Sequence, residues 1–174
     1  MIIKEIDIFR YKLPLKKPIR IKQNTLIHRE GLIIRIKDEK NYSGFGEIAP
    51  LPGLNKESIE DTINELLSLQ EKLLENTIPA NVEKLNGTFS FWFESFKISP
   101  SVQFGLESAI LTLIAAKKEI PLYLLLGQDH KSKVCVNALI DRDEDELLKK
   151  VMIKIDKKEA ILSCDKYHIR IDVS

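Results

Sequence analysis

Residues 44–53, GFGEIAPLPG, form the stretch of this chain that is best suited to contact a ligand. A predicted strand ends there in an aromatic residue and Glu47, and a loop with two prolines and a glycine follows. Proline fixes its own backbone angle and glycine permits a sharp exit, so this loop has few conformations. Such a loop is typical of a rigid structural turn and equally of a pocket wall. The candidate binding residues in it are Ala49, Leu51, Pro52 and Gly53.

Three further polar residues near the end of the sequence could also do chemistry. Arg170 precedes Asp172 by two positions in an alternating apolar–polar run, which places both side chains on one face of a strand. A guanidinium forms paired hydrogen bonds to a carboxylate, so Arg170 could bind a substrate carboxylate, and an ordinary surface arginine is the alternative. Lys154 also alternates with apolar neighbours, as charged residues do in any half-buried strand.

Three predicted strands lead into the proline-rich loop. Apolar and charged residues alternate over 2–13, and further strands are predicted over 31–37 and 42–48. We expect a basic connection, broken by prolines, over 12–20. Strands in this order and this close in sequence form an antiparallel meander. His28 and Arg29 fall in a second candidate pocket loop, for which a basic exposed loop is the alternative.

Two helices are expected after the loop. Apolar residues recur at helical spacing over 59–74, and Asn55 and Ser58 are the candidate N-caps of this helix. Pro100 suits the first turn of a second helix, which ends near Lys118.

Aromatic residues cluster in the segment that connects these two helices. They are Phe89, Phe91, Trp92, Phe93 and Phe96. We interpret the cluster as packing between the helices, and stacking on a ligand is the alternative.

The remaining sequence indicates the start of a second architecture. A short helical turn is predicted over 121–127, ended by glycine, and a buried strand over 134–140, of the kind that begins a parallel sheet. Residues 141–148 favour a helix. Beyond Val151 the pattern fits a strand or the end of that helix, and both interpretations stay open.

The composition is that of an ordinary globular protein. The chain has 174 residues, 44% of them hydrophobic, and a formal net charge of +1. Neither nucleic acid nor a membrane is indicated as a partner. The charged N-terminus is unlike a signal peptide, and no segment approaches the length of a membrane span. Cys135 and Cys164 lie far apart and form no metal-type spacing, which favours a reducing cytoplasm.

A set of short motifs, taken in order, resembles a known family. They are GEI at 46–48, PLPG at 50–53, PSVQFG at 100–105, PLYLLLG at 121–127 and VNALI at 136–140. Together they are similar to the capping domain and barrel entry of the enolase superfamily, and most closely to the o-succinylbenzoate synthases of menaquinone biosynthesis. The resemblance covers residues 1–150 continuously.

The resemblance implies an α+β enolase-like N-terminal capping domain, with an antiparallel meander and then helices, followed by an incomplete (β/α)8 barrel. The expected boundaries are 1–99 for the capping domain, 100–133 for a helical connection and 134–174 for the start of the barrel. In that family two loops of the capping domain close the substrate pocket. Here they would be residues 20–28 and 49–54.

The resemblance also implies the chemistry. The family carries out a Mg²⁺-assisted syn-dehydration of a small cyclohexadiene carboxylate, a lyase reaction. Lys154 would correspond to its general base, Asp172 to its first Mg²⁺ ligand and Arg170 to a contact with the substrate carboxylate. A proton alpha to a carboxylate is too weakly acidic for a lysine unless metal and cations neutralise the charge that develops.

The sequence departs from the family near its end. Lys154 has no second lysine two positions earlier, and only 18 residues separate it from Asp172, whereas a full βαβ unit needs about 30. A (β/α)8 barrel takes about 250 residues, and 174 − 134 = 40 follow Val134. We therefore expect that the chain alone is inactive and that an open barrel edge could cause self-association.

Two alternatives to this activity remain at the level of sequence. The first is another chemistry of the enolase superfamily, such as a dipeptide epimerase, a muconate cycloisomerase or an N-acylamino acid racemase. The second is a non-catalytic remnant or association module.

Overall fold

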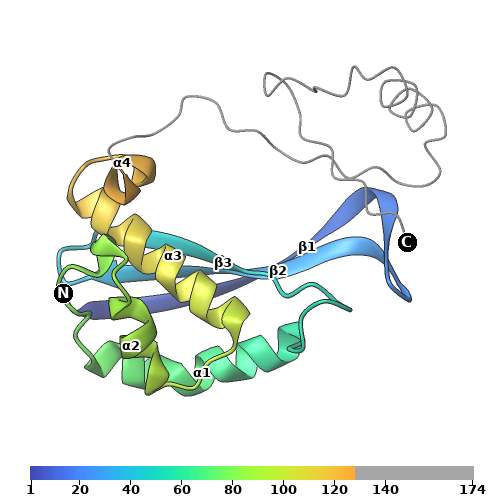
Figure 1. Cartoon of the computed structure of the whole chain (residues 1–174), viewed down its shortest axis with the longest axis horizontal. Coiled ribbons are helices and arrows are strands. Elements are labelled where there is room, and N and C mark those ends of the chain that lie inside the picture. The colour runs from blue at the N-terminus through green and yellow to red at the C-terminus, as the bar shows by residue number, and fades with distance from the viewer. Residues whose placement is uncertain (128–174) are drawn as a thin grey trace, which may run out of the picture. The chain divides into compact units, whose positions relative to one another are not determined.

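The computed structural model describes residues 1–127, which form a three-stranded antiparallel sheet in the order β1–β2–β3 with helices packed against it (Figure 1). The elements are β1 (Ile3–Ile21), β2 (Asn24–Asp38), β3 (Ser43–Ile48), α1 (Ile59–Glu75), the 3-10 turn η1 (Val82–Lys84), α2 (Thr88–Glu94), α3 (Pro100–Lys117) and α4 (Leu122–Leu126). This confirms the predicted α+β architecture of a meander followed by helices. The strand expected over 134–140 lies outside the described residues.

The connection predicted over 12–20 is wrong, because β1 continues to Ile21. The outer half of β1 pairs with the first residues of β2, with Ile19 opposite Leu26. The two strands therefore form one long hairpin that extends beyond the helices (Figure 1).

Two prolines made the outer half of the hairpin hard to predict. Pro14 is the last residue before a shift in the pairing register, and Pro18 lies within the shifted stretch. Proline cannot donate a ladder hydrogen bond, and it is tolerated in strands where the pairing is irregular. The segment 20–28, predicted to be a pocket loop, is thus the tip of the hairpin.

The sheet has one buried face and one exposed face. Leu32, Ile34 and Ile36 of β2 are completely buried, whereas Ile33 and Arg35 point to the opposite side. The alternation has the period of two that a half-buried strand requires. The predicted strand over 31–37 is confirmed, with a longer extent at its N-terminal end.

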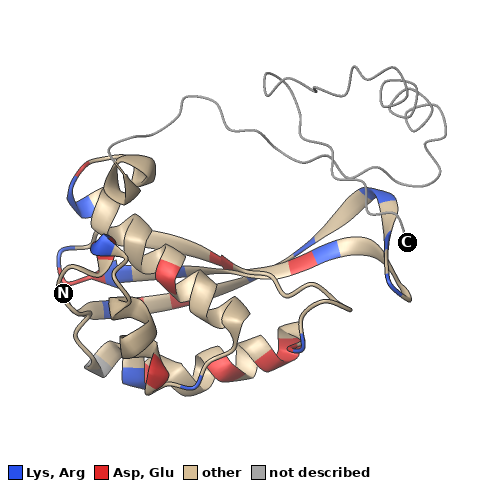
Figure 2. Cartoon of the chain, in the orientation of Figure 1, with Lys and Arg blue, Asp and Glu red and all other residues tan. Residues whose placement is uncertain are grey.

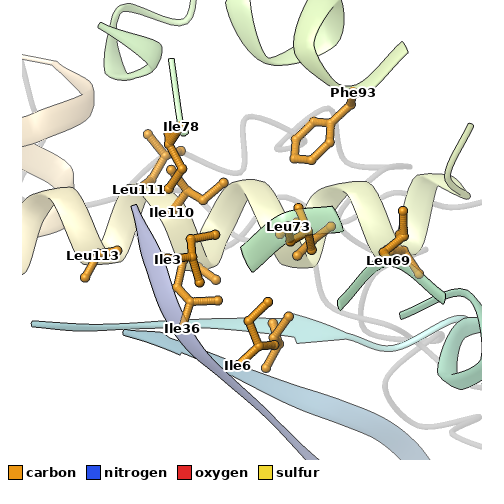
Figure 3. Close-up of a cluster of buried hydrophobic side chains, with 14 of the residues drawn as sticks. Ile3, Ile6, Ile36, Leu69, Leu73, Ile78, Phe93, Ile110, Leu111 and Leu113 are labelled. Carbon is orange, nitrogen blue, oxygen red and sulfur yellow. The ribbon is translucent and has the colours of Figure 1, made fainter. Parts of the chain in front are cut away.

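The core lies between the buried face of the sheet and the helices. Side chains from β1, β2, α1, α2 and α3 meet there, and Figure 3 shows Ile3, Ile6, Ile36, Leu69, Leu73, Phe93, Ile110 and Leu113 among them. α1 contributes the apolar stripe predicted over 59–74. Burial of each large aliphatic side chain stabilises the fold by about 1.5–3 kcal/mol.

The aromatic cluster joins this core from α2. Phe89 and Phe93 are buried, with ring centroids 5.9 Å apart, and Trp92 lies 4.8 Å from Phe93. Trp92 and Phe96 pack against the same core, as the predicted packing requires, but Phe91 is 79% exposed and takes no part in it.

Helix α3 approaches β3 more closely than ordinary side chains permit. Gly44 and Gly46 place their backbones against the backbone of α3, and a Cβ at Gly46 would overlap the carbonyl oxygen of Gly105. From the other side, a Cβ at Gly105 would overlap the side chain of Ile48. The glycines thus let a helix and a strand pack backbone to backbone.

Thr112 of α3 forms hydrogen bonds with backbone groups on the unpaired edge of β3. Its hydroxyl oxygen accepts a hydrogen bond from the N–H of Phe45 at 2.7 Å and lies 2.8 Å from the carbonyl oxygen of the same residue. An unpaired strand edge is a template for aggregation, and here the helix covers part of it.

The far end of α3 is joined to the sheet through Asp38. This carboxylate is buried and accepts hydrogen bonds from the N–H groups of Lys40 and Tyr42 at 2.9 and 3.0 Å and from Lys117 at 3.2 Å. Burial alone would raise the pKa of Asp38, but these hydrogen bonds outweigh it and hold the pKa below its ordinary value. Asp38 is therefore charged and paired at neutral pH.

We expect Gly46→Ala to lower the free energy of unfolding by about 2–3 kcal/mol, because the new methyl group would force α3 away from the sheet. Urea denaturation followed by circular dichroism measures the change. Gly127→Ala is the matched control, since a Cβ there meets nothing within 4 Å and the residue is extended, with φ −174°. An unchanged midpoint for Gly46→Ala would contradict the close contact.

Candidate functional site

The proline-rich loop leaves β3 and runs between the hairpin and the first turns of α1 and α3. Asn55 closes it: its side-chain oxygen accepts a hydrogen bond from the N–H of Leu51 at 2.8 Å. The N–H groups of Leu54 and Asn55 both donate to the carbonyl of Leu51 at 3.0 Å. Ser58, and not Asn55, is the N-cap of α1, where it forms a capping box with Asp61.

The structure brings together the two segments that the sequence predicted to form a pocket. Gly53 has a φ of +87°, which favours glycine, and a Cβ there would stand 2.8 Å from the side-chain nitrogen of Asn24 at the hairpin tip. The loop and the tip are thus in direct contact, although 29 positions separate these two residues in sequence (53 − 24 = 29).

Two cavities flank the loop. The larger, about 420 Å³ in volume, lies between the hairpin, the loop and the start of α1, and Pro52 and Gly53 are among its walls. The smaller, about 320 Å³, lies on the side of α3, and Ala49 lines it. Leu51 is not among the residues that line either cavity; its N–H and carbonyl groups form hydrogen bonds within the loop. Lys154, Arg170 and Asp172 lie outside the described residues.

Arg29 is the side chain that sequence reasoning undervalued. It is a half-buried residue of β2, not part of an exposed basic loop, and it lines both cavities. Its guanidinium donates to the carbonyl oxygen of Pro50 at 3.0 Å and to that of Ala49. The pairing register of the sheet places Arg29 beside the loop, and this register cannot be read from the sequence.

Tyr11 and Glu47 form a second polar pair beside Arg29. The hydroxyl of Tyr11 donates to the carboxylate of Glu47. Burial, together with this hydrogen bond and the charge of Glu47, raises the pKa of Tyr11 to about 12. The tyrosine packs over Gly31, where any Cβ would overlap its ring. Tyr11 is therefore a fixed donor and not a group that titrates near neutral pH.

Glu57 holds the loop against the N-terminus of α3. Its carboxylate accepts hydrogen bonds from the N–H of Ser101 at 3.2 Å and from the Ser101 hydroxyl. The bond from the hydroxyl is the main reason that the pKa of Glu57 lies below its ordinary value, and its own N–H and that of Ser101 add to the effect. A negative charge is stabilised at this end of a helix by the helix dipole.

The outer part of the hairpin is basic, whereas the lining of the larger cavity carries both signs of charge, with Arg29 and Lys56 beside Glu30, Glu57 and Glu60. Residues 8–29 contain no Asp or Glu, and the outer half of the hairpin is marked by basic side chains in Figure 2. The cations of this segment are Arg10, Lys12, Lys16, Lys17, Arg20, Lys22 and Arg29. A segment of this charge attracts anions.

The part of the chain that the structure describes, residues 1–127, has no group of three or more His, Cys, Asp or Glu side chains that could hold a metal ion. Within the same residues, no helix is long and apolar enough to cross a membrane.

Comparison with known families matches residues 3–113 to the model of the MenC N-terminal domain. The chain belongs to this family. The match includes the hairpin, the proline-rich loop and most of α3, and it confirms the resemblance to the o-succinylbenzoate synthases of the enolase superfamily that the motifs indicated.

Curated relatives agree with this assignment. The chain is 27% identical over 170 residues to an o-succinylbenzoate synthase from Haemophilus influenzae and 30% identical over 165 residues to one from Aliivibrio salmonicida. These alignments cover 97% and 95% of the chain but only 44% and 43% of the relatives. The chain thus spans somewhat less than half the length of these relatives.

Solved structures show the same fold. A dipeptide epimerase from Enterococcus faecalis, complexed with Mg and the dipeptide L-Leu-L-Tyr, superposes with a TM-score of 0.70 at 21% identity, over 99% of the chain and 46% of the epimerase. A hydrophobic dipeptide epimerase from the same organism is 24% identical over 148 residues, which cover 85% of the chain and 40% of that protein. The fold is therefore shared by enzymes with different reactions.

We expect Glu57→Gln to lower the free energy of unfolding by about 1 kcal/mol at pH 7, because the amide keeps the acceptor but loses the charge at the start of α3. Folding lowers the pKa of Glu57. Its contribution to the free energy of unfolding is therefore complete above the ordinary glutamate pKa of about 4.3, and it is lost as the pH falls through the pKa of Glu57 in the folded state. Denaturation of wild type and variant between pH 3 and pH 7 should show the two converging in acid. Glu71→Gln, on the exposed side of α1, is the control. A difference that does not depend on pH would contradict this role.

Proposed function

We propose that the chain provides the capping domain of an o-succinylbenzoate synthase, which converts 2-succinyl-6-hydroxy-2,4-cyclohexadiene-1-carboxylate to o-succinylbenzoate in menaquinone biosynthesis. The match of residues 3–113 to the MenC N-terminal domain is the observation that carries this proposal. The division into 1–99, 100–133 and 134–174 remains part of it.

The described residues suit an anionic substrate of this kind. The substrate is a dicarboxylate, and the segment 8–29, which contributes Leu26, His28 and Arg29 to the larger cavity, contains lysine and arginine and no acidic residue. Like charges concentrated at a cleft raise the local concentration of a ligand of opposite charge. In the proposal, Pro52 and Gly53 form one wall of the pocket and the hairpin forms the other, which together exclude water from the reacting carboxylate.

The proton transfer and the metal belong to the part of the protein outside residues 1–127. In the proposal Lys154 removes the proton, Arg170 binds a carboxylate and Asp172 is a ligand of Mg²⁺, each by resemblance alone. The described residues do not form a cation site of their own. When bound, Mg²⁺ supplies a positive charge that stabilises negative charge developing on the substrate.

Dipeptide epimerisation is the second candidate. The likeness to the Enterococcus faecalis epimerases, at a TM-score of 0.70 for the solved structure, favours it. A dipeptide carries an ammonium group as well as a carboxylate. The basic segment 8–29 of the hairpin is better matched to a dicarboxylate, which is why we place the synthase first.

A chimera tests the proposal. Residues 1–127 replace the matching N-terminal region of the Haemophilus influenzae synthase, and the formation of o-succinylbenzoate is followed by chromatography. We expect turnover within about a hundred-fold of the parent enzyme, the loss that a misplacement of about 1 Å produces.

The matched control carries the capping domain of the Enterococcus faecalis epimerase on the same synthase barrel. Residues 1–127 are also placed on the epimerase barrel. If the folded synthase chimera fails to dehydrate the substrate and the epimerase chimera epimerises dipeptides, the second candidate replaces the synthase. Circular dichroism and thermal melting establish that each chimera is folded.

A further inference from the structure

The loop from Ala49 to Gly53 begins where the β-ladder ends. Ile48 is the last residue of β3 and pairs with Leu32, whereas the residues of β2 before Leu32 pair only with β1. Pro50 and Pro52 have no N–H to donate, so the loop has few backbone bonds with which to hold itself in place. Its position must come from side chains around it.

The guanidinium of Arg29 provides hydrogen bonds to the loop beyond the point where the β-ladder ends. One nitrogen donates to the carbonyl oxygen of Pro50 at 3.0 Å, and the other terminal nitrogen donates to the carbonyl oxygen of Ala49. Two neighbouring carbonyls are thus bound by one planar fork. The register of the sheet puts Arg29 three residues before Leu32, beside the path that β3 would have taken had it continued.

We propose that Arg29 is a positioning residue that fixes the loop from Ala49 to Gly53 and thereby separates the two cavities. Both cavities are lined by Arg29 and Asn55, with Pro50 on the larger and Ala49 on the smaller, so the fork forms part of the wall between them. Lysine cannot replace it, because a single ammonium cannot reach two carbonyls in parallel geometry. That the loop contacts substrate rests on the proposed function; the tether itself does not.

Asn55 holds the loop from its other end, and it gives the proposal a measurable consequence. The N–H groups of Leu51, Leu54 and Asn55 are all bonded within the loop. If Arg29 fixes the loop, these amides should open together when the fork is lost. The core should stay closed, because Arg29 lies on the exposed face of the sheet, where it pairs with Leu13 rather than with core residues.

Amide hydrogen exchange by NMR on the full 174-residue chain tests this. We expect Arg29→Lys to speed exchange at Leu51, Leu54 and Asn55 by about ten-fold, with no change at amides of α3 and no change in the urea midpoint. Arg35→Lys is the matched control: it lies on the same strand and face and bonds Asp7 at 2.8 Å. It should leave the loop amides unchanged.

Three results would overturn the proposal. Wild-type exchange rates at the loop amides of Arg29→Lys would show that no fork is needed. Equal acceleration of loop and α3 amides with a lower midpoint would show that Arg29 acts on the whole fold. Acceleration of the loop by Arg35→Lys would show a general effect of changing the arginines. Because exchange requires no turnover, failure of the tether and failure of the proposed reaction are distinguishable.

Discussion

The contact between α3 and β3, backbone against backbone, is the constraint from which the site follows. Gly44, Gly46 and Gly105 remove the side chains that would keep the helix and the strand apart. Thr112 and Lys117 then fix the helix along the strand, one at the free edge and one at the buried Asp38. The start of α3 is thereby held beside the end of β3, which is where the proline-rich loop begins.

The loop is held by its neighbours as well as by the hydrogen bonds within it. Glu57 ties it to the N-terminus of α3, Asn55 closes it and Arg29 binds its first carbonyls from the hairpin side. Each of these contacts depends on an element that is already placed by the core. A capping domain built in this way can present a rigid pocket wall to a separate catalytic domain, and sequence changes in the loop can alter the pocket without disturbing the sheet.

Local sequence patterns were sufficient to predict most helices and strands. The features that the sequence did not predict depend on contacts between residues far apart in the chain. The alternation around Leu32, Ile34 and Ile36 and the helix start at Pro100 were sufficient to predict β2 and α3, because burial and helix capping depend on neighbours in sequence. The outer half of the hairpin was missed because its irregular pairing tolerates prolines. The role of Arg29 was missed because it depends on a contact with residues twenty positions away. The predicted roles of Lys154, Arg170 and Asp172 fall outside the described residues and remain predictions.

The most direct test of this account is the nuclear Overhauser effect between Gly46 and α3 in the full chain. A Cβ added at Gly46 would lie 2.9 Å from the backbone nitrogen of Ala109. An α-proton of Gly46 and the amide proton of Ala109 should therefore give a strong cross-peak. We predict that this peak appears together with the cross-strand peaks of the sheet. Its absence, with the sheet peaks present, would show that α3 does not rest on the glycines and would contradict the account of how the site is positioned.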